Sequence, residues 1–115
     1  MKILIIVNES PWGTSLGVTA FRLVRAMVAN EARVAAVFFR GDGVYHAQTD
    51  GRTDSGTPCL AKEWRALSRQ ADIPLLLCSA AAQRRLENVS SAGFREAGLA
   101  EVMAIMADSD RVVTF

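Results

Sequence analysis

The sequence predicts a three-layer α/β/α fold, in which helices cover both faces of a mostly parallel sheet within one domain spanning residues 1–115. Runs of β-branched and leucine residues alternate with amphipathic helical stretches, the pattern of parallel strands joined by helical crossovers. The strand-like runs are continuously apolar rather than alternating, as in strands that are covered on both faces. A chain of 115 residues, 50% of them hydrophobic, is long enough for one core.

Each element is predicted from a local pattern. Residues 2–8 form an apolar run typical of a first strand, and the apolar residues of Leu16–Ala29 recur at helical spacing with Arg22 and Arg25 on other faces. Residues 41–58 are rich in Gly, Asp, Ser and Thr, which predicts a long loop. The other elements are a strand at 33–40, a helix marked by Leu60, Trp64, Leu67 and Ala71, a strand at 74–78, a short helix at 80–86, a helix at Leu99–Ala107 and a strand at 111–115.

Charge and composition exclude several classes of function. A formal net charge of +1 provides no general attraction to nucleic acid or to an anionic membrane, so direct tRNA binding is not expected. The apolar run at the N-terminus is shorter than the roughly 20 residues of a membrane span and lacks a signal-peptide cleavage pattern. We therefore expect a cytoplasmic protein. Cys59, Cys78 and the lone His46 are too few for a zinc site, so no metal is expected.

Cys78 is the leading candidate for chemistry, because the carboxyl ends of parallel strands gather at one edge of a sheet and Cys78 ends a predicted strand. The first amides of the following helix, those of Ser79 and Ala80, would stabilise a thiolate there. Arg84 or Arg85 would add a second favourable charge. Without a neighbouring base, the chemistry that fits is sulfur exchange at the thiol itself. Inert packing of a buried cysteine is the alternative, and both interpretations stay open.

Other candidates have simpler explanations. His46 is expected to be a solvated loop histidine without a catalytic partner, and Cys59 an incidental exposed thiol. Residues 8–17 predict a plain turn between strand and helix, with phosphate binding as a weaker alternative because a lysine and the glycine spacing are absent. Met103 and Met106 are expected in the core. Three aromatic residues near the carboxyl edge are expected to anchor an interface: Trp12, Phe39 and Tyr45.

Four stretches resemble the DsrE/TusD family of sulfur-relay proteins. They are KILIIVNESPWGT at residues 2–14, VAAVFFRGDGVYHA at 34–47, LLLCSAAAQRR at 75–85 and DRVVTF at 110–115. The second stretch and the cysteine of the third are the most specific. The resemblance implies a DsrE-like fold related to flavodoxin, with Cys78 as the persulfide-carrying nucleophile. Trp12, Gly13 and Tyr45 would lie in loops that line the site.

The resemblance also implies a function and partners. A TusD-like member would be a sulfurtransferase subunit that relays a persulfide between upstream and downstream carrier proteins for 2-thiouridine formation at the tRNA wobble position. A DsrE-like member would serve cytoplasmic sulfur oxidation, and the sequence does not separate the two. Either would form a heterohexamer with two smaller related subunits, TusB/TusC-like or DsrH/DsrF-like, and would need no cofactor.

One departure from the family is a shorter stretch between Leu86 and Val102, which is expected to alter the site or the docking of partners. A non-catalytic assembly or ligand-binding subunit is the alternative from a different class.

Overall fold

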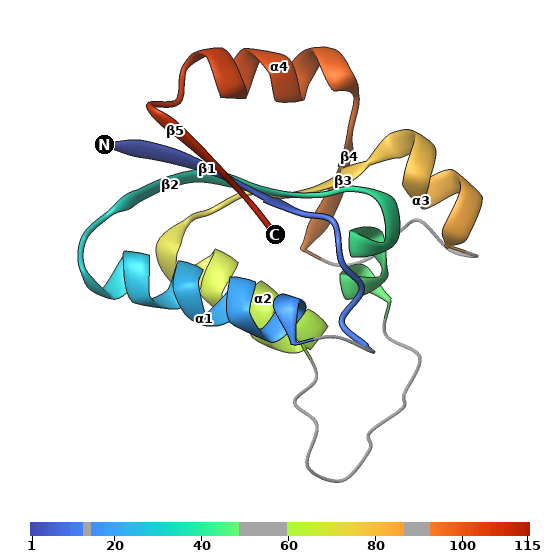
Figure 1. Ribbon diagram of the computed structural model, residues 1–115, viewed down its shortest axis with the longest axis horizontal. Coiled ribbons are helices and arrows are strands. Elements are labelled where there is room, and N and C mark those ends of the chain that lie inside the picture. Colours follow the sequence, from blue (N-terminus) through green and yellow to red (C-terminus); the bar gives the residue numbers. More distant parts are fainter. Residues whose placement is uncertain (13–14, 49–59, 87–92) are drawn as a thin grey trace, which may run out of the picture.

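A five-stranded sheet forms the centre of the computed structural model, which describes residues 1–12, 15–48, 60–86 and 93–115 (Figure 1). All neighbouring strands run parallel, in the order β4-β3-β2-β1-β5. The strands are β1 (Lys2–Val7), β2 (Arg33–Phe39), β3 (Leu75–Cys78), β4 (Phe94–Ala97) and β5 (Arg111–Thr114). The predicted α/β class is therefore confirmed.

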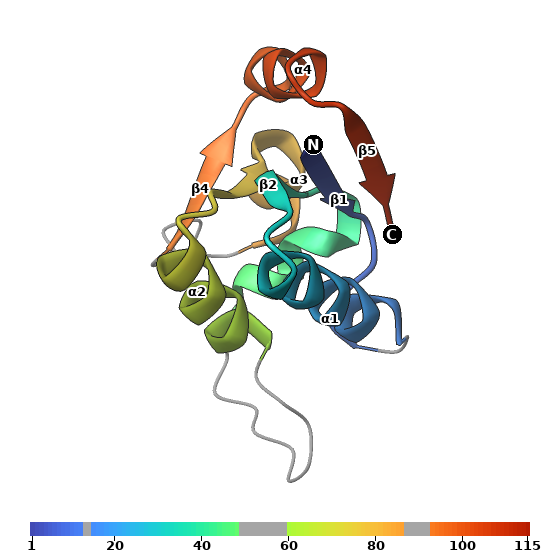
Figure 2. The same cartoon turned by 90° about the vertical axis from the view of Figure 1, so that its left-hand side faces the viewer.

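Helices cover both faces of this sheet. Figure 2 shows α1 (Leu16–Ala29) and α2 (Leu60–Ala71) beneath one face and α4 (Leu99–Ala107) above the other. A short helix, α3 (Ser79–Arg85), follows β3 directly, and a 3₁₀ helix, η1 (Gly41–Ala47), follows β2. Both short helices therefore lie at the carboxyl edge of the sheet, where the loops of an α/β protein gather.

The core is divided by the sheet into two unequal parts. Between the sheet and the helices α1 and α2, the Trp64 ring meets Phe21 and Phe39 edge to face, with ring centroids 5.1 and 5.3 Å apart. The part under α4 is smaller and contains Phe38 and Leu76. Phe38 and Phe39 belong to different parts because successive residues of a strand point to opposite faces.

Several expectations about elements and burial were wrong. β4 was not predicted, because its sequence FREA carries two charges and few residues that favour strands. Residues 41–47 form η1 rather than open loop, and residues 49–59 lie outside the described part. Met103 and Met106 are 58% and 41% exposed, since α4 turns Val102 and Ile105 toward the sheet instead.

His46 is buried rather than solvated, with only 1% of its surface exposed. Its Nε2 lies 3.0 Å from the Glu9 carbonyl oxygen, and its Nδ1 accepts a hydrogen bond of 3.3 Å from Trp64 Nε1. A carbonyl only accepts and an indole N–H only donates, so the imidazole is neutral with its proton on Nε2. Sequence-distant partners satisfy both ring nitrogens, and neighbouring residues in the chain gave no sign of them.

Two glycines allow η1 to pack this closely. A Cβ added at Gly17 of α1 would lie 2.8 Å from the His46 Cε1, so the helix approaches the imidazole only without a side chain. A Cβ added at Gly43 would lie 2.1 Å from the Val7 carbonyl oxygen, which belongs to the backbone of β1 and has little freedom to move. Phe39, expected at an interface, is fully buried against this group, with its ring centroid 5.2 Å from that of His46.

We predict that Gly43→Ala destabilises the protein by about 1–3 kcal/mol or more, the usual cost of forcing extra volume into a packed site. Urea unfolding would measure this change. Gly98→Ala is the control, because nothing lies within 4 Å of a Cβ added there. Equal effects of the two substitutions would contradict the close packing of η1 on β1.

We also predict a pH dependence that belongs to His46. Burial lowers the pKa of His46 from 6.5 to about 4, opposed in part by the hydrogen bond with the Glu9 carbonyl. In the unfolded chain His46 therefore binds a proton near pH 6.5, whereas in the folded protein it binds one only near pH 4. The free energy of unfolding contains the full His46 contribution above pH 6.5 and loses it as the pH falls through this window, at about 1.4 kcal/mol per unit.

Urea unfolding of the wild type and of His46→Gln, between pH 7.5 and about 4.5, would test this contribution. The variant should be less stable at neutral pH, and its deficit should shrink as the pH falls, because only the wild type loses the histidine contribution. The other titrating groups are shared by the two proteins. A deficit that stays constant across the range would refute the assignment.

Candidate functional site

Cys78 lies at the junction of a buried strand and a helix. Leu75, Leu76 and Leu77 of β3 are buried, and Cys78 is the half-buried residue that ends the strand and caps α3. Its side chain packs against both parts of the core. It is also the one cysteine within the described ranges and is unpaired. The side chain is therefore supported by the core, while part of the residue stays accessible at the end of the strand.

A short polar chain surrounds the start of α3. The Ser79 hydroxyl donates to Glu96 Oε1 at 3.3 Å, and the Gln83 side-chain amide donates to the Ser79 hydroxyl oxygen at 3.4 Å. Glu96 reaches this position because β4 pairs with β3, in a register that sets Ala97 opposite Cys78. Sequence reasoning missed Glu96 together with its strand. The signal that it overlooked is the pair Gly93 and Gly98, which bracket the four strand residues.

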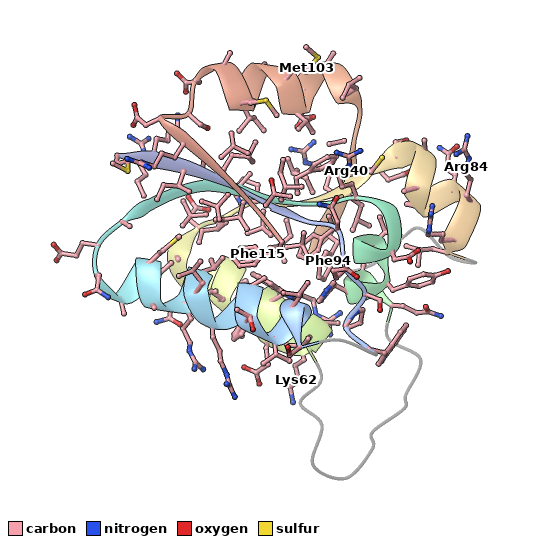
Figure 3. All side chains as sticks on the ribbon, in the orientation of Figure 1. Arg40, Lys62, Arg84, Phe94, Met103 and Phe115 are labelled. Carbon is pink, nitrogen blue, oxygen red and sulfur yellow. The ribbon has the colours of Figure 1, made fainter. Side chains whose placement is uncertain are left out.

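The two predicted arginines are placed differently from one another. Arg85 Nε lies 2.9 Å from Asp42 Oδ1, so its guanidinium joins α3 to η1. Arg84 is exposed in the last turn, and Figure 3 shows it at the outer end of α3. A rise of about 1.5 Å per residue separates Arg84 from Ser79 by roughly 8 Å along the helix. A role for either arginine at Cys78 stays a prediction, as does that of the Ser79 and Ala80 amides.

Trp12, in the loop after β1, and Tyr45, in η1 after β2, lie in contact, as expected for loops that gather at one edge of the sheet. Trp12 is 45% exposed, and its ring centroid lies 5.8 Å from that of the half-buried Tyr45. Gly13 and Thr14 lie outside the described part, so neither a site-lining role of Gly13 nor a phosphate loop at residues 12–15 is tested.

Arg40 is a cation of this edge that sequence reasoning did not consider. It follows the last residue of β2, and its amide donates to the Val7 carbonyl oxygen at 3.0 Å. Phe39 pairs with Leu77, so the next positions along the two strands are Arg40 and Cys78. The available signal was its place directly after a predicted strand, the same kind of place that singled out Cys78.

A cluster of metal ligands and a membrane-spanning helix are both absent from the described residues. In residues 1–12, 15–48, 60–86 and 93–115, no three His, Cys, Asp or Glu side chains are grouped so that they could hold a metal ion. None of the helices in these ranges is long and apolar enough to cross a membrane. Cys59 lies in the part that is not described.

The resolved pKa shifts of carboxylates occur away from Cys78. Arg95 donates two hydrogen bonds to the Glu101 carboxylate, which lowers the pKa of Glu101, and the ammonium of Lys2 lowers the pKa of Asp108. Both pairs tie the ends of α4 to the sheet.

Relatives with assigned names match this chain along its whole length. "Sulfurtransferase TusD homolog" of Vibrio vulnificus (strain YJ016) is 31% identical over 133 residues, covering 100% of this chain and 98% of the relative. The protein of the same name from Pasteurella multocida (strain Pm70) is 31% identical over 124 residues, covering 98% of each chain. Both alignments are longer than the 115 residues of this chain, so the relatives have stretches without a counterpart here. A deletion between Leu86 and Val102 would account for such gaps, and its position stays a prediction.

A solved structure shares the fold. The crystal structure of the ychN protein from E. coli superposes with a TM-score of 0.88 at 23% identity, covering 100% of this chain and 99% of that one. The sequence also matches the DsrE/DsrF-like family over residues 1–115. With a match across the full length and relatives at 31% identity, this chain belongs to the DsrE/DsrF-like family.

Proposed function

We propose that this chain is a sulfurtransferase subunit that carries sulfur as a persulfide on Cys78. The family and the sulfurtransferase names of its relatives support a sulfur-relay role in general. The observation that carries the finer proposal is the placement of Cys78, half-buried at the carboxyl end of a core strand and at the start of α3. Catalytic groups of open α/β sheets gather at this edge.

The proposed transfer needs only a persulfide donor and thiols. The Cys78 thiolate attacks the outer sulfur of a donor persulfide, R–S–SH, so that a new S–S bond forms at Sγ while the donor S–S bond breaks. The electron pair of the broken bond leaves on the donor as R–S⁻, and Cys78 becomes Cys–S–SH. An acceptor thiolate then attacks the outer sulfur and releases Cys78 as a thiolate. No electrons are gained or lost overall, so no redox cofactor takes part.

The local structure suits such a carrier. The core supports Cys78 from behind, while its half-exposed position leaves room for a partner thiol to approach. The amides of Ser79 and Ala80 begin α3 and lie among the first helical amides, which lack partners within a helix. In this proposal they help to stabilise the thiolate and the persulfide anion.

The proposed pathway and partners follow the family resemblance. We favour sulfur transfer for 2-thiouridine formation at the tRNA wobble position, because the relatives carry the TusD name. Sulfur oxidation in the cytoplasm is the second pathway. The chain would act in the cytoplasm, within a heterohexamer with two smaller related subunits. An assembly role alone is the rival function, and it is favoured by the apolar outer side of α4, where Leu99 is 72% exposed.

We predict that incubation with a small persulfide donor adds one sulfur atom to Cys78. After alkylation and trypsin digestion, mass spectrometry should find the added sulfur on the fragment of residues 70–84, and reductant should remove it. Cys78→Ser should abolish loading without changing the oligomer size in gel filtration. Cys59→Ser, whose site lies in the separate fragment 53–62, is the matched control and should load normally.

Two results would count against the carrier. A wild type that gains no sulfur at Cys78, and whose Cys78 thiol also alkylates slowly in the folded protein, would leave the assembly role. Equal loading of Cys59 and Cys78 would show unselective thiol chemistry instead of a built site.

A further inference from the structure

The register of β2 and β3 brings an arginine beside Cys78. The two strands pair in parallel through Phe39 and Leu77, and each continues by one residue, to Arg40 and to Cys78. Arg40 keeps an extended backbone, with φ −129° and ψ 163°, and its amide bonds to the Val7 carbonyl of β1. The strand geometry therefore extends through Arg40. Neighbouring strands of a sheet lie about 4.8 Å apart, which sets the spacing of these two backbones.

The two side chains point to the same face of the sheet. Phe38 and Leu76 belong to the core under α4, whereas Phe39 and Leu77 belong to the core on the other side. Side chains alternate along a strand, so Arg40 and Cys78 return to the α4 face. Cys78 packs against the core under α4 as well as against the other core part, and Figure 3 shows Arg40 on the α4 side of the sheet.

Arg40 also differs from Arg85 and Arg95 in having no counter-ion among the described residues, a property that it shares with Arg84. Its side chain is exposed and forms no ion pair or hydrogen bond with any residue in the described part of the chain. Arg85 is held by Asp42, and Arg95 by Glu101 at 2.7 and 2.9 Å. Arg84 lies in the last turn of α3, at the end of the helix away from Cys78. Arg40 is thus the cation that starts next to Cys78 and is free to turn toward it.

We infer that Arg40 is the charge-stabilising residue of the Cys78 site, where its guanidinium faces the thiolate before sulfur transfer and the persulfide anion afterwards. This inference rests on the proposed function. A guanidinium remains charged at every physiological pH and presents several N–H donors in one plane, so it can follow the negative charge from Sγ to the outer sulfur. The role expected for Arg84 or Arg85 of α3 thereby passes to the residue that follows β2.

The test measures the rate of Cys78 alkylation at pH 7 and low salt, and separately the fraction of Cys78 that a persulfide donor loads. Arg40→Met keeps the apolar stem and removes the charge, and it should slow alkylation by about tenfold or more, as expected for the loss of a close opposite charge. Arg40→Lys should recover most of the rate. High salt should reduce the difference between wild type and Arg40→Met, because the charge is exposed to solvent.

Two further arginine variants make the result specific. Arg22→Ala removes an exposed arginine from α1, on the other face of the sheet, and should alkylate and load like the wild type. Arg84→Ala tests the rival arginine and should also behave like the wild type; its tryptic fragment extends to Arg85. Thermal unfolding and the alkylation rate of Cys59 in each variant control for loss of the fold.

The outcomes separate the two proposals. If the wild type loads sulfur while folded Arg40→Met alkylates and loads at the wild-type rate, the Arg40 inference is overturned and the carrier stands. A slow Arg84→Ala beside a normal Arg40→Met would also overturn it, and so would an equal loss in Arg22→Ala. If the wild type does not load, the carrier fails, while the alkylation rates still decide whether Arg40 acts on the Cys78 thiol.

Discussion

The neutral imidazole of His46 is the contact on which the carboxyl edge of this protein depends. It binds the backbone after β1 through Glu9 and the centre of α2 through Trp64, so η1 is held between two elements that are distant in sequence. From this fixed position η1 reaches α3 through the Asp42–Arg85 pair. A charged imidazole would lose the Trp64 hydrogen bond, because both of its ring nitrogens would be donors. The placement of η1 at the carboxyl edge is therefore coupled to the protonation of His46.

The sheet separates a large aromatic core on one face from a thinner layer on the other. The face covered by α1 and α2 has a large aromatic core, with Trp64 and Phe39 fully buried. The opposite face is covered by α4, whose outer side exposes Leu99 and Met103. Cys78 packs against both core parts and sits at the end of the strand between them. In the proposed function, this place gives the Cys78 thiol support from the core while partners approach from the thinner side.

Much of the fold could be read from the sequence, which also proposed Cys78 as the leading site residue. The rest of the fold was missed for identifiable reasons. The bounds of Leu16–Ala29 and Leu99–Ala107 were predicted as observed, because strong local patterns define them. β4 could not be predicted, since its four residues are a strand only by pairing with β3. Burial of His46 and exposure of Met103 were misjudged because each depends on which elements pack against its side chain. Arg40 was overlooked because only strand register places it beside Cys78.

By itself the sequence determined the α/β class, the family resemblance and the selection of Cys78, because these depend on hydrophobic periodicity and on residues that are adjacent in the chain. Only the tertiary structure decided the strand β4, the neutral state of His46 and which arginine follows the strand paired with that of Cys78. Those features arise from hydrogen bonds and strand pairings between segments far apart in the chain. Local patterns contain no information about such partners, since register and burial are set by how the whole domain packs.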